Sequence, residues 1–196
     1  MRCSALLLAG GKSSRMGRDK AFLELEGEPL WQRQVTTLRA LSPEQLMIAG
    51  PRREEWTELE VIADEIAEAG PLAGVAAALR RCSAPHLLVL AVDLPIVTAD
   101  FFRALLELCR KEQGAVPTAP GRAQPLAAIY PIAALPLATD ALRRGEFAMQ
   151  KFVRDALAQG LVREREILPE ETELFANLNT PADYERLRQR EICRHR

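Results

Sequence analysis

The sequence predicts a single three-layer α/β domain built on a mostly parallel central sheet. Strand-like apolar runs alternate with helical patterns along the chain, an order typical of βαβ units. One run, HLLVLAVD at 86–93, is apolar almost throughout, as expected of a strand buried on both faces. A length of 196 residues, 48% of them hydrophobic, allows one sizeable core, so we expect one domain over 1–196.

The first half of the chain shows the alternation most clearly. The run CSALLLA at 3–9 predicts the first strand, and 29–41 has apolar residues at helical spacing after a first-turn Pro29. Short apolar runs predict strands at 45–50 and 59–64. The remaining elements of this half are an Ala- and Leu-rich helix at 71–82, the strand at 86–93, and a helix at 98–112 capped by Thr98.

The second half is less regular. The run QPLAAIY at 124–130 predicts a strand, and the alternating LVREREIL at 161–168 predicts another. Between them, helical spacing is present over 131–145 and 147–160, and the second of these helices ends at Gly160. A capped helix is expected at 180–194.

Composition excludes several functional classes. A formal net charge of -1 and a pI of about 6.2 give no overall attraction to nucleic acid or to an anionic membrane. No apolar run approaches the roughly 20 residues of a membrane span, and the N-terminal run leads into GGKSSRMGRDK without a cleavage pattern. We therefore expect a cytoplasmic protein with four reduced, mostly buried cysteines, at positions 3, 82, 109 and 193.

A glycine-rich, cationic segment follows the first predicted strand. Gly10 and Gly11 let the backbone approach a ligand closely, and free N–H groups in such a loop form an anion-binding concavity. Arg15, Arg18 and Lys20 add positive charge suited to phosphate. The segment matches neither GxGxxG nor GxxxxGK[ST], and the alternative is a surface turn with solvated cations. Its position directly after a buried strand favours a polyphosphate site.

Asp93 ends the apolar run in the stretch AVDLP. A carboxylate there is costly to bury unless it is paired or bound to a metal. Ligands of open α/β sheets bind at the carboxyl ends of the strands, so Asp93 is expected beside the basic loop. A carboxylate beside a polyphosphate typically holds Mg²⁺. The alternative is an aspartate that only caps a turn.

A third constellation is Asp64 followed by EAGPLAG. Gly70, Pro71 and Leu72 lead into the predicted second helix, and a helix N-terminus attracts negative ligands. Asp64 follows a predicted strand and is placed to accept hydrogen bonds from a base or ribose. The alternative is a loop aspartate that makes a turn.

These residues resemble a known family. The opening LLLAGGKSSRMGRDKAFLELEGEPLWQRQV looks like that of nucleotidyltransferases, which move an NMP from an NTP and release pyrophosphate. The stretches GPLAG and NLNTP narrow the resemblance to the molybdenum cofactor guanylyltransferases, over Leu8 to about Tyr184. The resemblance implies a Rossmann-like fold of the nucleotide-diphospho-sugar transferase type and transfer of GMP from GTP to the terminal phosphate of molybdopterin.

The resemblance also assigns roles to individual positions. Leu8, Ala9, Gly10, Lys20 and Asp64 match GTP contacts, Asp93 matches the Mg²⁺ ligand, and Asn177 and Asn179 match positions tied to the pterin. With the loops above, the expected nucleotide-binding residues are Leu8, Ala9, Gly10, Gly11, Lys20, Asp64, Gly70, Pro71, Leu72 and Asp93. The expected catalytic residues are Arg15, Lys20 and Asp93. One departure is Ala49, which stands where the family often has an asparagine that contacts the nucleotide.

Two other functions stay open at this point. One is a cytidylyltransferase acting on molybdopterin or another phosphorylated acceptor, against which GPLAG counts. The other is a nucleotide-binding module without catalysis, against which Lys20 and Asp93 count. GTP, molybdopterin (with or without Mo) and Mg²⁺ are the expected ligands, and molybdoenzyme-maturation proteins are candidate partners.

Overall fold

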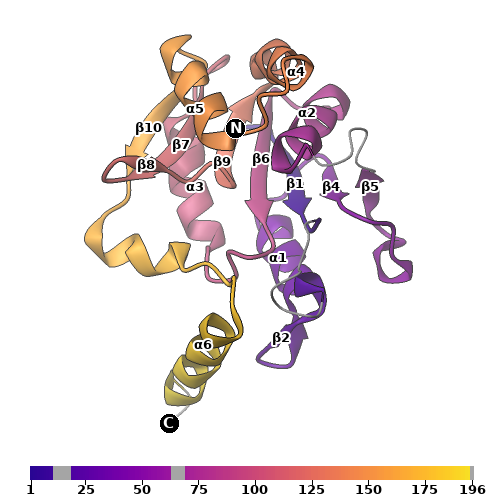
Figure 1. Ribbon diagram of the computed structural model, residues 1–196, viewed down its shortest axis with the longest axis vertical. Helices are drawn as coiled ribbons and strands as arrows, with labels where there is room; N and C mark the ends of the chain where they lie inside the picture. Colours follow the sequence, from indigo (N-terminus) through magenta and orange to yellow (C-terminus); the bar gives the residue numbers. More distant parts are fainter. Residues whose placement is uncertain (11–18, 63–68, 195–196) are drawn as a thin grey trace.

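The protein is a three-layer α/β structure in which helices cover both faces of a central sheet (Figure 1). The structure, a computed structural model, describes residues 1–10, 19–62 and 69–194. The eight-stranded sheet has the order β10-β7-β9-β6-β1-β4-β5, with β8 paired to β7. Its strands are β1 (Ser4–Leu8), β4 (Leu46–Ala49), β5 (Glu60–Ile62), β6 (His86–Ala91), β7 (Gly114–Ala119), β8 (Arg122–Ala123), β9 (Ala127–Pro131) and β10 (Val162–Glu166).

Most of the sheet is parallel, as the sequence predicts. β1 pairs in parallel with β4 and β6, β4 with β5, and β7 with β10. β9 is the exception among the long strands, because it runs antiparallel to both of its neighbours, β6 and β7. The predicted fold class is confirmed.

Helices lie on both faces of this sheet. On one face, α2 packs against α4, and α4 packs against α5. On the other face, α3 lies beside α1. There Arg103 of α3 donates to the carbonyl of Ala40, at the end of α1, at 2.9 Å. The helices are α1 (Leu30–Arg39), α2 (Pro71–Arg81), α3 (Ala99–Leu108), α4 (Leu135–Arg143), α5 (Met149–Ala158) and α6 (Pro181–Arg194). Short 3₁₀ turns are η1 (Lys20–Phe22), η2 (Glu54–Trp56), η3 (Ile132–Ala134) and η4 (Pro169–Phe175).

Several features differ from the sequence-based expectation, and two of them are longer than a single turn. The strand β7 (Gly114–Ala119) was not predicted; it contains Pro117, which lacks the N–H that a ladder needs. The hairpin of β2 (Glu24–Leu25) and β3 (Glu28–Pro29) was not predicted; it lies directly before α1 and includes Pro29, which was expected in the first turn of that helix. Its turn residues Glu26 and Gly27 both have positive φ, at 54° and 76°, which a two-residue hairpin turn of type I′ requires.

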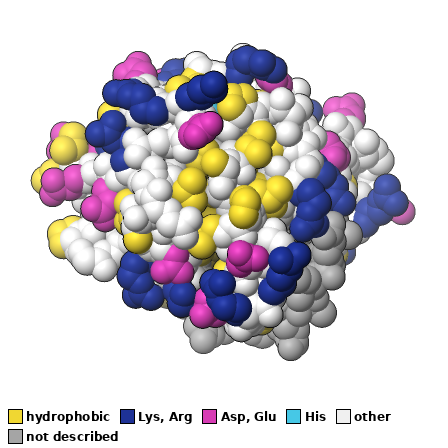
Figure 2. Space-filling view, turned by 90° about the horizontal axis from the view of Figure 1, so that it is seen from above, with side chains coloured by type: hydrophobic (Ala, Val, Ile, Leu, Met, Phe, Trp, Pro, Cys, Tyr) yellow, Lys and Arg dark blue, Asp and Glu magenta, His cyan; other side chains and the backbone are white. Residues whose placement is uncertain are grey.

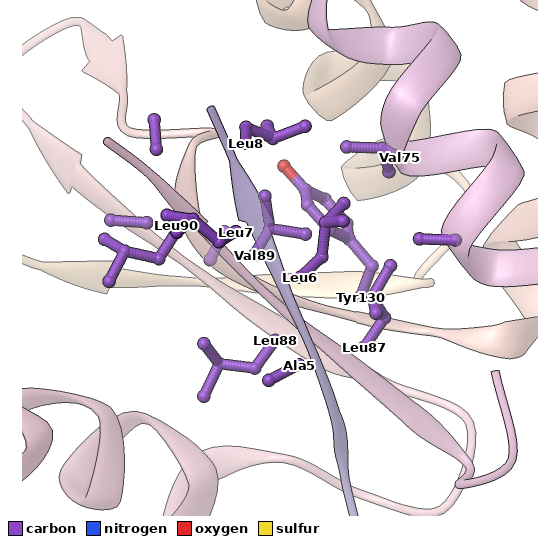
Figure 3. Close-up of a cluster of buried hydrophobic side chains, with 14 of the residues drawn as sticks. Ala5, Leu6, Leu7, Leu8, Val75, Leu87, Leu88, Val89, Leu90 and Tyr130 are labelled. Carbon is purple, nitrogen blue, oxygen red and sulfur yellow. The ribbon is translucent and has the colours of Figure 1, made fainter. Parts of the chain in front are cut away.

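The core forms where β1 and β6 lie side by side. Successive side chains of a strand point to opposite faces, and Figure 3 shows this alternation in both strands. Leu6 and Val89 face α2, near Val75 and Tyr130 (Figure 3). The burial of both faces explains why β1 and β6 read as continuous apolar runs.

The two ends of the sheet differ in character. Figure 2 shows the end at which the parallel strands begin, where hydrophobic side chains in the middle are surrounded by charged side chains of both signs. The carboxyl ends of β1 and β6 lie at the opposite end, beside α6 and the β2–β3 hairpin (Figure 1). Among the described residues, no helix is long and apolar enough to cross a membrane.

Candidate functional site

The carboxyl ends of β1, β4 and β6 meet in a hydrogen-bonded crest. The N–H of Gly10 donates to the carbonyl of Ala49 at 3.0 Å, which ties the chain after β1 to the end of β4. The N–H of Val92 donates to the carbonyl of Leu8 at 3.0 Å, which ties the chain after β6 to the end of β1. The three segments thus leave the sheet side by side.

Gly50 is the residue that allows this close approach. A Cβ at position 50 would lie 3.1 Å from the nitrogen of Gly10 and 3.3 Å from the carbonyl carbon of Ala9. Backbone atoms cannot move away as a flexible side chain can, so a larger residue would push β4 away from the chain after β1. The end of β4 therefore supports the start of the glycine-rich segment.

Of residues 8–10, where nucleotide contacts are expected, only the main chain borders the crest. Leu8 and Ala9 are 8% and 6% exposed, so their side chains belong to the core and only their main chain borders the crest. Gly10 is exposed and has no side chain. A ligand can therefore come close to the main chain here, as expected from the glycine at position 10.

The ammonium of Lys20 reaches the crest at Asp93, just after β6. It donates to Oδ1 of Asn179 at 2.8 Å and lies 3.8 Å from Oδ2 of Asp93. Lys20 and Asn179 are separated by 159 residues in sequence, and the fold brings them into contact. Lys20, Asp93 and Asn179, which the sequence analysis links to phosphate, to Mg²⁺ and to the pterin, therefore form one cluster.

Asp93 holds a carboxylate in a poorly solvated position. Its side chain is 26% exposed, and burial raises the pKa of the carboxyl above its usual value, although the nearby Lys20 ammonium acts in the opposite direction. A carboxylate that is short of solvent is of the type that suits Mg²⁺, which keeps several waters and uses one or two carboxylates together with substrate phosphates. Among the described residues, no group of three or more His, Cys, Asp or Glu could hold a metal ion.

The segment carrying the two asparagines is fastened to the crest. The N–H of Leu178 donates to the carbonyl of Asp93 at 2.9 Å, which places Asn179 beside Lys20. Asn177 is exposed, and its amide donates to the carbonyl of Phe175 at 3.4 Å. The structure therefore brings Asn179 into the cluster directly and leaves Asn177 at its outer side.

Two contacts that the sequence did not reveal hold this segment. Arg165 and Glu171 form a two-pronged ion pair, and Glu171 also accepts from the N–H of Leu168 at 3.0 Å, so η4 is anchored to β10. Tyr184 on α6 donates its hydroxyl to the carbonyl of Glu24 at 2.7 Å. The C-terminal segment thus spans from β10 to the β2–β3 hairpin. The arginine and tyrosine lie in stretches that look like ordinary solvated faces, and no local pattern marks them.

The start of α2 supplies backbone groups. Gly70 precedes the helix with φ of 63°, a value that favours glycine, and Pro71 occupies its first turn. Leu72 is fully buried, so at this position only its main chain remains for a ligand. Pro71 has no N–H, and the N–H of Ala73 donates to the carbonyl of Gly70 at 3.2 Å, so Leu72 supplies the N–H that a helix start leaves without an intrahelical partner.

Ala49 packs in the core. It is 3% exposed, and a Cβ added at Gly74 of α2 would lie 3.2 Å from the Cβ of Ala49. The side chain at position 49 therefore points between β4 and α2. The missing Cβ at Gly74 is what makes room for Ala49 and for Leu8.

Some expected site residues lie outside the described part of the chain. These are Gly11, Arg15 and Asp64. His86, which the sequence did not assign to the site, is fully buried at the start of β6, at the other end of the sheet from Asp93.

Comparisons with known proteins identify the family of this chain. Residues 5–161 match the family described as the MobA-like NTP transferase domain. A protein of Opitutus terrae named probable molybdenum cofactor guanylyltransferase is 46% identical over 189 residues, which cover 94% of each chain. The crystal structure of molybdopterin-guanine dinucleotide biosynthesis protein A from Archaeoglobus fulgidus superposes with a TM-score of 0.74 at 26% identity, covering 98% of this chain and all of that one.

A more distant structure shows the same fold. The 2-C-methyl-D-erythritol 4-phosphate cytidylyltransferase of Thermus thermophilus has a TM-score of 0.72 at 19% identity, covering 95% of this chain and 98% of that one. At this identity the likeness concerns the fold alone.

Proposed function

The chain belongs to the family of MobA-like NTP transferase domains, and from that premise we propose that it transfers GMP from GTP to the terminal phosphate of molybdopterin. The products are pyrophosphate and the molybdopterin guanine dinucleotide cofactor. The name of the relative that is 46% identical over nearly the whole chain supports this activity. The observation that carries the proposal is the contact of Lys20 with both Asp93 and Asn179. This contact brings together the side chains proposed to bind the phosphates, the metal ion and molybdopterin.

The reaction needs no nucleophilic side chain. The terminal phosphate of molybdopterin attacks the α-phosphorus of GTP in line, a new P–O bond forms, and the bond to pyrophosphate breaks with its electron pair. The attacking group is already an anion, so no general base is required. Catalysis then consists of positioning and charge neutralisation, and these are the tasks of Lys20 and of Arg15.

Asp93 is the proposed ligand of Mg²⁺. When bound, the ion would neutralise charge on the triphosphate and polarise its oxygens. The poorly solvated carboxylate supports this role, because an ionised group that burial disfavours gains from a cation. Between turnovers Lys20 supplies part of that positive charge.

The two substrates are proposed to approach from different sides of Lys20. The main chain at 8–10, Gly11, and the start of α2 would hold GTP, with Asp64 directed to the base or ribose. Asn177 and Asn179 would hold molybdopterin. The anchoring of Leu178 to Asp93 supports this division, because it places Asn179 next to the proposed metal ligand.

The test is release of pyrophosphate from GTP, CTP and ATP, each with molybdopterin present and absent. We expect release with GTP that depends on both molybdopterin and Mg²⁺. A preference for CTP would establish the cytidylyl alternative, and binding of nucleotide without release would establish a module that does not catalyse. A single nucleotidyltransferase domain over 1–196, maturation proteins as partners and a cytoplasmic location stay predictions.

A further inference from the structure

We propose that Arg53 is a positioning residue, which holds the turn carrying Lys20 so that its ammonium stays at the crest. Arg53 follows β4 and lies outside the nucleotide-binding set expected from the sequence. The inference rests on the proposed function, since it concerns how Lys20 is presented to the phosphates of GTP. It assigns to Arg53 no contact with substrate.

The turn that carries Lys20 is short. η1 has three residues, closed by hydrogen bonds from the N–H of Phe22 to Asp19 and from the N–H of Leu23 to Lys20, both at 3.1 Å. Asp19 also caps it, because its Oδ1 accepts from the N–H of Ala21 at 3.1 Å. A single 3₁₀ turn of this length has few bonds of its own, so contacts from outside decide where it lies.

Arg53 supplies one of these outside contacts on the N-terminal side of Lys20. Its guanidinium lies 2.6 Å from Oδ2 of Asp19. The two oxygens of Asp19 are therefore used separately, one for the cap and one for Arg53. An ion pair to the other oxygen fixes the carboxylate plane and so supports the cap.

The same short segment also holds the C-terminal side of the turn. The guanidinium carbon of Arg53 lies 5.8 Å from the centre of the Phe22 ring. Phe22 in turn stacks on Trp56, with ring centres 6.3 Å apart and planes at 8°. Trp56 is 1% exposed and meets Trp31 edge to face, so it is a fixed platform in the core.

Arg53 and Trp56 thus hold Asp19, which directly precedes Lys20, and Phe22, which lies two residues after it. A lysine side chain is long and has many rotamers, so the position of its ammonium depends on where its main chain is held. Loss of Arg53 removes the ion pair to Oδ2 of Asp19 and the contact with the Phe22 ring together. Lys20 then reaches Asp93 and the phosphates from a less ordered turn.

Arg52 provides a matched control. It is the neighbouring residue, has the same side chain, is exposed, and forms no ion pair within the part of the chain that the structure describes. A general effect of removing one positive charge near the site would be the same for both arginines. A positioning effect belongs to Arg53 alone.

The experiment measures the binding of GTP with Mg²⁺ and of guanosine by calorimetry. Arg53→Ala is expected to weaken GTP binding about fivefold, the scale of one partly exposed ion pair, and to leave guanosine binding unchanged. Arg53→Lys is expected to restore part of the loss, and Arg52→Ala to match the wild type. Thermal melting checks that each variant is folded.

A double-mutant cycle decides whether Arg53 acts through Lys20. In a Lys20→Ala background, adding Arg53→Ala should cause no further loss of GTP affinity. Additive losses would show that Arg53 acts on GTP binding independently of Lys20. An unchanged GTP affinity in Arg53→Ala alone would show that Arg53 does not position Lys20. Either result overturns this inference and leaves the proposed function standing. A wild-type protein that does not bind GTP would overturn the proposed function as well.

Discussion

Replacing Asp93 with asparagine is expected to abolish turnover and, at the same time, to make the free protein slightly more stable. The carboxylate is 26% exposed, and the ammonium of Lys20 lies 3.8 Å from it. At that distance the attraction is roughly 4 kcal/mol at an effective dielectric constant near 20 and about 1 kcal/mol in water. The pKa of Asp93 is nevertheless raised, so the cost of removing the charge from water exceeds this attraction.

The sign of the effect on stability follows from linkage. A carboxyl whose pKa is higher in the folded state than its ordinary value of 3.8 binds protons more tightly when folded. The ionised group therefore costs stability above the raised pKa, and this cost disappears below about 3.8. Asparagine has no charge to desolvate, so Asp93→Asn should raise the free energy of unfolding at pH 7 by about 0.5–2 kcal/mol, the usual scale for relaxing a functional site.

Two measurements on the same variant test this reasoning. Thermal melting should show an increase at pH 7 of about 2–4 °C per kcal/mol, which shrinks as the pH falls toward 3.8. Pyrophosphate release should fall by at least about 100-fold, the scale of removing one preorganised electrostatic contact. A variant that melts several degrees lower at pH 7 would refute the account of burial, and near-normal turnover would refute the role of Asp93.

Three further predictions concern separate parts of the molecule. Lys20→Ala should weaken GTP binding by about tenfold or more, because a charged hydrogen bond is lost, while guanosine binding stays unchanged; equal losses for both ligands in calorimetry would contradict a phosphate contact. Gly114→Ala should destabilise the protein by about 3 kcal/mol or more, because the new Cβ would overlap the carbonyl of Ile129, whose carbon lies 2.8 Å away; a wild-type urea midpoint would show that β7 and β9 tolerate a side chain there. Burial lowers the pKa of His86 below its ordinary 6.5, so the unfolded chain takes up a proton first and stability should fall as the pH drops below 6.5; urea titrations at pH 7 and pH 5.5 should show this fall in the wild type and a smaller one in His86→Leu.

The sequence predicts the parallel part of the fold well, because its signals are local. β1 and β6 read as buried strands since both faces are covered, and α2 begins at the Pro71 that marks its first turn. β7 carries no such local signal, because its sequence GAVPTA contains a proline, which is disfavoured within a sheet. The antiparallel insertion of β9 between β6 and β7 depends on pairings between distant segments, which no local pattern carries.

The site divides in the same way. Lys20 and Asp93 follow strands whose carboxyl ends must meet, so their proximity could be predicted from the fold class. The contact of Asn179 with Lys20 could not, because the C-terminal segment reaches the crest through Leu178, and the sequence pointed to Asn179 only through a family resemblance. Arg53 looks like a solvated charge in the stretch GPRREEW, and its contact with Asp19 exists only because β4 lies beside β1.

The destination of the α-phosphate tests the central claim most directly. The protein is incubated with molybdopterin, Mg²⁺ and GTP labelled at either the α- or the γ-phosphate, and the products are separated. We predict that the α-label appears in the molybdopterin guanine dinucleotide and the γ-label in pyrophosphate, in equal amounts. An α-label that stays in GTP or GDP, or that is transferred from CTP in preference to GTP, would contradict the transfer of GMP to molybdopterin.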